Sequence, residues 1–339
     1  MKNGLMIVSP NSAGLMNIGD YIQALAACQF FDNINVYIDR DWGLNKEQKE
    51  KVRMIMNGWY MDHPENFPPS EDIIPLYVSM HINSFGLPGL LREECVDYFK
   101  KHAPIGCRDY NTVELLKGKG VDAYFTGCLT LTLGRKYHYS GKREGTYIVE
   151  PHFSTKDISR RPILLMKSML TLIFHYQSVK CIAQKKKDVS FKSLLHNAVF
   201  FKEYSKVFDK EILLKAQYIN QMNREIGEMS YEERLKYAEK LIQMYSKAEC
   251  VITSRIHCAL PCLGLETPVL FVVDSEAGNM STMRFGGLLN LLNTIIWKHE
   301  GLIWKAAPIT RATFPKNKTE WKVIADELIQ KCEKFAGEK

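Results

Sequence analysis

One stretch of the sequence combines residue types that bind anions and transfer protons. Ser254, Arg255, Ile256 and His257 follow the apolar residues 250–253. An arginine brings a fixed positive charge and a planar fork of N–H donors, and a histidine exchanges a proton near neutral pH. Small and apolar residues after His257 predict that a helix begins there, and helix N-termini attract anions. We therefore expect an anion site with an acid/base residue, the alternative being a structural histidine.

A second cluster, Arg108 and Asp109, follows the apolar residues 103–107, and Asn111 or Thr112 is expected to cap the next helix. An arginine at the end of a strand is well placed to bind a carboxylate or a phosphate through two parallel hydrogen bonds. The alternative is a structural ion pair between Arg108 and Asp109. We interpret the cluster as a second cation for an anionic ligand.

A third cluster, Asn17, Gly19 and Asp20, lies between the first apolar run and a helical pattern. Backbone N–H groups at a helix start can bind an anion or a sugar hydroxyl. Alternatively, Asp20 only caps the helix. The pattern is not the G-x-G-x-x-G of a dinucleotide site, so we expect these residues to bind another kind of substrate.

A polar loop after the apolar residues 268–273 contains Ser275, Glu276 and Arg284. These side chains could complete a binding pocket, although a solvated loop would also explain them. They are included among the candidate substrate-binding residues.

Short apolar runs alternate with helical patterns around these clusters. The runs expected to be strands are 5–9, 34–38, 74–80, 103–108 and 122–127, and the helical patterns are 19–31, 45–59, 90–102 and 110–120. This alternation predicts an α/β fold with a mainly parallel sheet. Ligands of such folds bind at the carboxyl ends of the strands, where the polar clusters lie.

A second α/β series follows the polar residues 134–144. Its strands are expected at 145–151, 178–183, 250–254, 268–273 and 294–297, and a helix at 230–248 begins with the capping box of Ser230 and Glu233. We expect an N-terminal domain (1–140), a C-terminal domain (141–317) with a basic helical insertion near 155–230, and a C-terminal amphipathic helix (318–339).

The composition narrows the class of protein. The chain has 339 residues, a net charge of +7 and nine scattered cysteines without a C-x-x-C pair, which favours reduced thiols in a cytoplasmic protein. Neither a signal peptide nor a run of about 20 apolar residues is apparent. No His and carboxylate cluster has metal-ligand spacing, so we expect no metal in catalysis.

Taken in order, the clusters resemble the polysaccharide pyruvyl transferase family. The likeness rests on NIGD near the N-terminus, on GCRDYNTVELLKGKGVDAYFTGCLTLTL (106–133) and on VITSRIHCALPCLGLETPVLFV (251–272), which is similar to the family's Ser-Arg-x-His signature. It covers most of the chain except about 155–230. Many relatives carry Gly-Asp-Pro where this chain has TGCLTL with Cys128, so no role for an acid carries over there.

The resemblance implies two Rossmann-like domains facing across a cleft, as in GT-B glycosyltransferases. It also implies transfer of pyruvate from phosphoenolpyruvate to a sugar of a surface or capsular polysaccharide precursor, as a ketal. Arg108, Arg255 and His257 match family residues tied to substrate binding and catalysis. Two arginines also suit the carboxylate and phosphate of this donor, and His257 suits acid/base chemistry. No cofactor is expected beyond the donor substrate.

The middle of the chain is strongly basic. Residues 156–202 contain ten Lys or Arg and two Asp, beside the apolar run 162–176. A solvated basic face is one explanation. The other is peripheral contact with anionic lipid at the inner face of the membrane, which suits an acceptor sugar carried on a polyprenyl diphosphate. Nucleic acid is not expected as a partner, because aromatic residues are not interleaved with the basic ones.

Two other functions remain open at this point. A sugar-nucleotide-dependent glycosyltransferase of the GT-B type would bind a nucleotide sugar instead of phosphoenolpyruvate. A non-catalytic scaffold for glycan biosynthesis would bind without turnover.

Overall fold

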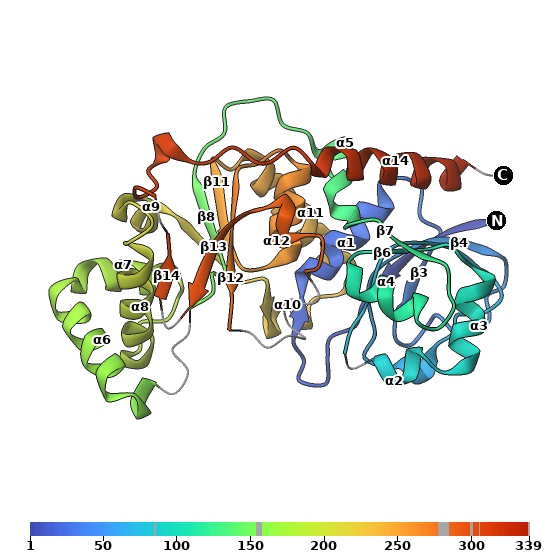
Figure 1. Ribbon diagram of the computed structural model, residues 1–339, viewed down its shortest axis with the longest axis horizontal. Helices are drawn as coiled ribbons and strands as arrows, with labels where there is room; N and C mark the ends of the chain where they lie inside the picture. The colour runs from blue at the N-terminus through green and yellow to red at the C-terminus, as the bar shows by residue number, and fades with distance from the viewer. Residues whose placement is uncertain (85, 154–157, 277–284, 299–300, 305, 338–339) are drawn as a thin grey trace.

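The computed structural model describes residues 1–84, 86–153, 158–276, 285–298, 301–304 and 306–337. It is a mixed α/β fold with two six-stranded sheets that are largely parallel (Figure 1). The sequence prediction of an α/β class with parallel sheets is therefore confirmed.

The first sheet consists of six parallel strands in the order β3-β1-β4-β5-β6-β7. The strands are β1 (Lys2–Ile7), β3 (Val36–Asp39), β4 (Val52–Tyr60), β5 (Ile73–Ile82), β6 (Ile105–Cys107) and β7 (Ala123–Phe125). The helical elements of this part are α1 (Ile18–Cys28), η1 (Pro64–Asn66), α2 (Leu87–Leu90), α3 (Glu93–Lys101), α4 (Tyr110–Lys117), η2 (Leu129–Thr132) and α5 (Gly134–Tyr137).

The second sheet has the order β14-β13-β12-β11-β8-β9, with only β14 antiparallel to its neighbour. The strands are β8 (Thr146–Val149), β9 (Gln217–Ile219), β11 (Cys250–Thr253), β12 (Val269–Asp274), β13 (Asn293–Lys298) and β14 (Gly301–Ile303). The helical elements are η3 (Ile158–Arg160), α6 (Pro162–Phe174), α7 (Tyr176–Lys185), α8 (Phe191–Tyr204), α9 (Lys210–Lys215), α10 (Arg224–Glu228), α11 (Tyr231–Lys247), α12 (Ile256–Gly264), η4 (Leu289–Leu291), η5 (Arg311–Thr313) and α14 (Trp321–Gly337).

The two sheets share one topology. Numbered along the chain within each sheet, the strands lie in the order 2-1-3-4-5-6. The order reverses between the first and third strands, which are β1 and β4 in one sheet and β8 and β11 in the other. A crevice forms outside the carboxyl ends of the strands at such a switch point, and ligands bind there. The fold therefore provides two switch points that can face a common ligand.

Helix α1 joins the two sheets into one body. It packs against α11 and α12, which belong to the second sheet, and Figure 1 shows it between the two sheets. One hydrophobic core contains Ile22 of α1, Leu241 of α11 and Leu260 of α12. A two-stranded antiparallel ladder, β2 (Met16–Asn17) with β10 (Met222–Asn223), adds a second link. This shared core fixes the residues of one sheet against those of the other.

The C-terminal helix returns to the first half of the chain. Helix α14 contacts η2, α12 and β5, and Figure 1 shows it running from the second sheet across to the side of the N-terminus. Trp321, Leu328 and Phe335 are buried on its inner face. The amphipathic helix predicted near the C-terminus is confirmed, and it packs against both halves.

Two predicted elements are wrong. The helix expected at 45–59 is absent; β4 begins at Val52 and lies in the middle of the first sheet. A central strand is buried on both faces, and the near-continuous apolar run that results does not alternate. The strand expected at 178–183 lies inside α7, where Val179 and Ile182 are buried at helical spacing. Short apolar runs of this kind do not distinguish a strand from a buried helix.

The helix predicted at 230–248 is confirmed as α11. The Ser230 hydroxyl accepts a hydrogen bond from the Glu233 backbone N–H at 3.2 Å, and the Glu233 carboxylate accepts one from the Ser230 N–H at 2.7 Å. This capping box satisfies two N–H groups that have no partner within the helix.

Candidate active site

A cavity of about 880 Å³ lies at the carboxyl ends of both sheets. Residues that follow strands of the first sheet line it from one side, and residues that follow β8, β9 and β11 line it from the other. Its lining comprises Asn17, Asp20, Trp59, His81, Ile82, Asn83, Ser84, Leu87, Arg108, Asn111, Leu115, Glu150, Pro151, His152, Phe153, Gln221, Met222, Ser254, Arg255, Ile256 and His257. The two switch points therefore contribute to one cavity, and ligand-sized cavities in proteins have this volume.

Arg108 and His257 meet at the base of this cavity. Arg108 follows β6 of the first sheet and His257 is the second residue of α12, yet Arg108 Nη1 lies 2.9 Å from His257 Nε2. Both side chains are buried. A guanidinium can only donate, so His257 Nε2 accepts this hydrogen bond and the imidazole is neutral in this state. The proton of the ring is then on Nδ1.

Gln23 and Asp20 of α1 extend this contact. The Gln23 amide nitrogen is placed 3.1 Å from His257 Nδ1 and 3.2 Å from Asp20 Oδ1, while Gln23 Oε1 has no partner among the described residues. An amide can present its oxygen or its nitrogen at the same place. With the oxygen toward His257, Gln23 accepts from Nδ1–H and, when Asp20 is protonated, from the Asp20 carboxyl as well. The four side chains then form a chain of hydrogen bonds.

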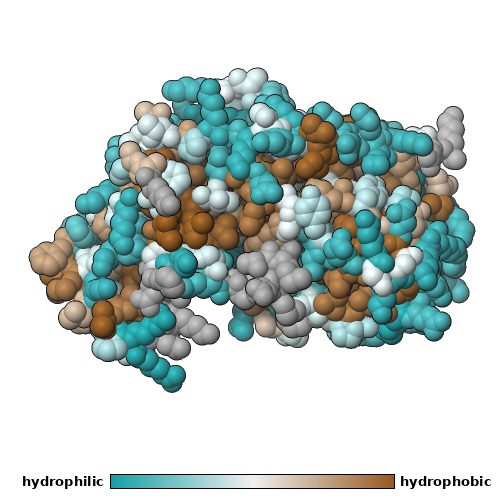
Figure 2. All heavy atoms as spheres, viewed as in Figure 1, coloured by the Kyte–Doolittle hydropathy of each residue, from teal (hydrophilic) through white to brown (hydrophobic). Residues whose placement is uncertain are grey.

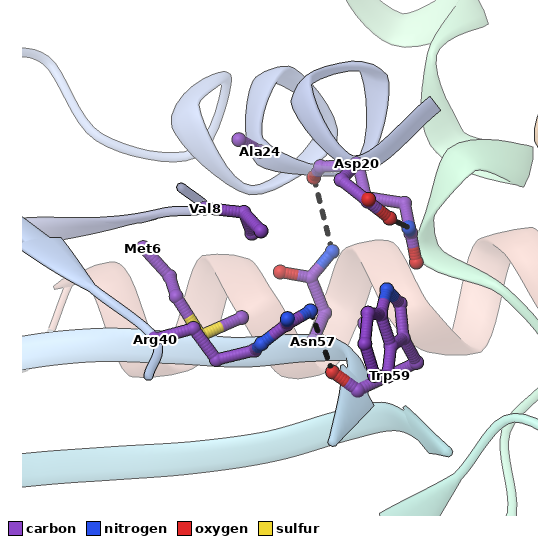
Figure 3. Close-up of a pocket in the computed structure, with 9 residues that line it drawn as sticks. Met6, Val8, Asp20, Ala24, Arg40, Asn57 and Trp59 are labelled. Carbon is purple, nitrogen blue, oxygen red and sulfur yellow. Dashed lines mark hydrogen bonds between the residues drawn. The ribbon is translucent and has the colours of Figure 1, made fainter. Parts of the chain in front are cut away.

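The environment of Asp20 lets its carboxyl take up a proton at a higher pH than an exposed aspartate does, below about pH 6. Burial raises the pKa of the Asp20 carboxyl from 3.8 to about 6, although Arg40, a hydrogen bond donated by Trp59 and Arg108 all favour the ionised form. Figure 3 shows Asp20 above Trp59 and Arg40, around a second cavity of about 10 Å³. That volume is close to the space of one water molecule.

Gly19 allows α1 to approach His257. A Cβ atom at this position would lie 2.8 Å from His257 Cβ and 3.1 Å from Asn17 Oδ1. Asn17 caps α1 by accepting a hydrogen bond from the Gly19 N–H, so the alternative in which Asp20 is the cap is wrong. Asn17 and Asp20 line the cavity, whereas Gly19 supports it by close packing.

A histidine and a carboxylate form a second pair in the cavity wall. Asp109 is fully buried and accepts a hydrogen bond from His81 Nδ1 at 2.7 Å. Its other oxygen accepts from the Thr112 backbone N–H at 3.0 Å, so Asp109, and not Asn111 or Thr112, caps α4. The carboxylate fixes the tautomer of His81, and Nε2 is then the ring atom that can exchange a proton with a substrate.

Asp109 is also close to Arg108, with 4.0 Å between Oδ2 and Nε. The ion pair between Arg108 and Asp109 that the sequence suggested therefore exists. It leaves Arg108 Nη1 able to donate a hydrogen bond to His257. Asp109 itself is not among the residues that line the cavity. It acts by positioning His81 and Arg108.

The second sheet places Arg255 and Ser254 at the opposite wall. Arg255 Nε donates to the carboxylate of Glu150, which lies at the end of β8 with a positive φ of 39°. A non-glycine residue with positive φ is strained, and such residues cluster at functional sites. The Ser254 hydroxyl accepts a hydrogen bond from the His152 N–H at 2.6 Å and so holds the segment after β8. Ile256, the first residue of α12, also lines the cavity.

Two candidates are not brought to the cavity. Ser275 and Glu276 are exposed and are not among its lining residues; the Ser275 hydroxyl donates to the Trp297 carbonyl at 3.0 Å. Asp274, one residue earlier, lies 3.5 Å from Nε2 of the cavity residue His152. The third candidate of this loop, Arg284, lies outside the described residues.

The sequence prediction missed His81, Gln23 and Glu150. His81 comes directly after the predicted strand 74–80 and Glu150 lies at the end of the predicted strand 145–151, so the rule that selected Arg108 would also have selected them. Gln23 gives no such signal, because it lies within an amphipathic helix. Its role depends on the packing of α1 against α12.

Cys128 is buried beside Thr130, with 3.1 Å between Sγ and Oγ1. Burial raises the pKa of this thiol, against the opposing effect of Arg108. The nine cysteines of the chain are free. Cys128 is therefore a neutral packing residue below the site.

Fold and site together define a class of protein: an α/β protein with an arginine and histidine site between the switch points of two sheets. The family model for polysaccharide pyruvyl transferases matches residues 17–276, which include Arg108, Arg255 and His257. The chain belongs to the polysaccharide pyruvyl transferase family and is a transferase of that class.

Among solved structures, a functionally uncharacterized protein of Klebsiella pneumoniae is similar to the chain. The identity is 13%, the match covers 87% of this chain and 93% of that one, and the TM-score is 0.44. This likeness is too low to bear on function. Among curated proteins, none matches the chain.

The described residues contain neither a group suited to a metal ion nor a helix suited to a membrane span. No group of three or more His, Cys, Asp or Glu residues is placed to hold a metal ion in this part of the chain. Likewise, none of the helices built from those residues is long and apolar enough to cross a membrane.

Proposed function

We propose that this transferase takes pyruvate from phosphoenolpyruvate and forms a ketal with two hydroxyls of a sugar in a surface or capsular polysaccharide precursor. The observation that carries the proposal is the arrangement of Arg108, Arg255 and His257 around one cavity. The donor has a carboxylate and a phosphate, and guanidinium groups bind both through charge-assisted hydrogen bonds. Asn17, Asp20, Ser254 and Ile256 are the proposed further substrate contacts.

We also propose that residues 1–140 and 141–317 are two Rossmann-like domains in a GT-B-like arrangement. In support, each of these parts contains one six-stranded sheet of the same topology, and the cavity lies between their switch points. The basic helical insertion then connects the first and second strands of the second sheet, β8 and β9, as α1 connects β1 and β3 of the first sheet.

The proposed reaction needs one proton added to carbon and two removed from oxygen. Protonation of the donor's methylene carbon makes C2 electrophilic, and one sugar oxygen attacks C2 as its proton is removed. The bond between C2 and the phosphate oxygen then breaks, the phosphate leaves with its electron pair and a proton, and the second sugar oxygen closes the ketal as its proton is removed. The site therefore needs groups that both give and take protons.

His257 and His81 are the proposed acid/base pair. His81 receives a proton at Nε2 because Asp109 holds its Nδ1–H, so it suits the removal of a hydroxyl proton. His257 Nε2 accepts from Arg108 and cannot deliver a proton in this state. When the phosphate or carboxylate of the donor binds Arg108, that hydrogen bond is replaced and His257 Nε2 becomes available to carry a proton.

We propose that the acceptor is carried on a polyprenyl diphosphate, in the cytoplasm at the inner face of the membrane. Proton transfer and anion binding by the chain's own residues account for each step above, and the proposed mechanism uses no cofactor.

The test is release of inorganic phosphate from phosphoenolpyruvate with a panel of lipid-linked glycans as acceptors. We expect acceptor-dependent release, with loss of about a hundredfold or more in rate for His257→Gln, since general acid/base groups contribute 10²–10⁴-fold. Arg108→Gln should chiefly weaken donor binding, measured by calorimetry. His138→Gln, on the exposed surface, is the matched control.

Two results would contradict the proposal. Stabilisation by nucleotide sugars but not by phosphoenolpyruvate in a thermal-shift screen would favour a glycosyltransferase. Full phosphate release by folded His257→Gln would refute the assignment of His257.

A further inference from the structure

Helix α6 has apolar side chains on both faces, and those of its outer face are exposed. Ile163, Met166, Met169, Leu170, Ile173 and Phe174 are exposed, the last two by 69% and 76%. On the opposite face, Leu164 is buried together with Ser168 and Thr171, whose hydroxyls donate to the backbone carbonyls of Leu165 and Lys167. The outer face of a helix packed on a soluble protein normally carries charged and polar side chains instead.

The exposed residues form one continuous stripe. Ile163, Met166, Leu170, Ile173 and Phe174 recur at spacings of three, four, three and one, which place them on one side of the helix. Figure 1 shows α6 at the end of the molecule away from the first sheet, and Figure 2 shows brown and tan side chains exposed beside teal ones at that end. A continuous exposed apolar stripe of this kind marks an interaction surface for a protein or a membrane.

The charges around the stripe are of one sign. Residues 158–187 contain seven Lys or Arg and no Asp or Glu, although one of them, Lys186, is turned inward to Asn197 and the Phe200 ring. Lys167 is exposed between Met166 and Met169, and Arg160 and Arg161 are exposed before the first turn of the helix. The partner of this surface should therefore be apolar and negatively charged.

The apolar character and positive charge of this surface favour a lipid bilayer over a second copy of the chain as its partner. In a symmetric dimer through this surface, the basic residues of one copy would face those of the other, and like charges repel. An anionic lipid bilayer offers both an apolar layer and a sheet of negative charge, and helices that lie in it combine large apolar side chains with Lys and Arg. Lipid fits the observed surface better than a second copy of this chain.

The residues of this surface follow cavity residues closely in the sequence. After β8, Pro151, His152 and Phe153 line the cavity, and the chain then continues to η3 and α6. We propose that α6 is a membrane-docking helix, which inserts its Ile163–Phe174 stripe into the headgroup region of an anionic bilayer. This surface is separate from the catalytic residues, so the proposal does not depend on the proposed reaction.

The experiment is sedimentation of the full chain with sucrose-loaded vesicles of phosphatidylcholine alone or with about 30% phosphatidylglycerol. We expect binding to the anionic vesicles that weakens with salt. The double variant Ile173→Gln/Phe174→Gln should lower the partition coefficient by about a hundredfold. Lys167→Gln should lower it about fivefold, and only with anionic vesicles.

The matched control is Val323→Gln on α14, which removes an apolar side chain of similar exposure (65%) outside this surface. It should leave vesicle binding unchanged, and far-UV circular dichroism should show that each variant is folded. Failure of the wild-type chain to sediment with anionic vesicles would overturn the proposal. Unchanged binding of folded Ile173→Gln/Phe174→Gln would do the same. A third contrary result would be a dimer of the wild-type chain in analytical ultracentrifugation that does not bind vesicles and that Ile173→Gln/Phe174→Gln abolishes.

Discussion

The protonation of Asp20 makes a quantitative prediction for stability. The pKa of its carboxyl is raised by burial from 3.8 to about 6 in the folded chain, so between these pH values the folded state holds a proton that the unfolded state has released. The contribution to stability is therefore complete below about pH 4 and is lost as the pH rises through about 6. The difference in pKa corresponds to about 3 kcal/mol.

Asp20→Asn keeps the shape of the side chain and removes the titration. Urea unfolding of both chains, at intervals from about pH 4 to pH 7, gives the free energy of unfolding at each pH. The wild-type chain should lose about 2 to 3 kcal/mol relative to Asp20→Asn across this range, with the change ending above about pH 6.

Asp122→Asn, at an exposed carboxylate, is the control and should run parallel to the wild type. A constant difference between wild type and Asp20→Asn at all pH values would refute the reasoning, because it would mean that Asp20 titrates alike in the folded and unfolded states.

Two further predictions concern packing and helix capping. Gly19→Ala should lower the free energy of unfolding by about 1 to 3 kcal/mol and reduce activity, because the new Cβ would lie 2.8 Å from His257 Cβ. The control is Gly337→Ala, where nothing lies within 4 Å, and it should change neither property. Equal stability of the two variants in thermal unfolding would contradict the packing argument. Ser230→Ala should lower the free energy of unfolding by about 1 kcal/mol, because the α11 capping box is lost. Phosphate release should be unchanged at a temperature where the variant is folded. Loss of activity at that temperature would show that α11 does more than pack.

Much of the fold could be predicted because its signals are local. The alternation of apolar runs and helical patterns predicted parallel α/β sheets, and the capping box predicted the start of α11. The errors at 45–59 and 178–183 arose where burial on both faces, or burial within a helical layer, removed the periodic contrast on which such predictions depend.

The candidate site was predictable in its residue types but not in its contacts. Arg108, Arg255 and His257 were selected because each follows a strand end, and all three line the cavity. The same rule failed for Ser275 and Glu276, because a position after a strand does not say which way the loop turns. The β12 side chain that reaches a cavity residue is Asp274 instead.

The sequence by itself determined the class of fold, the family and several of the strand ends that line the cavity. The tertiary structure alone decided that Arg108 donates to His257, that Gln23 links His257 to Asp20, and that Asp109 fixes His81. The physical reason is the range of the interactions involved. Periodicity and capping act over a few residues, whereas a contact such as Arg108 with His257 joins positions 149 residues apart and forms only when α1 packs between the two sheets.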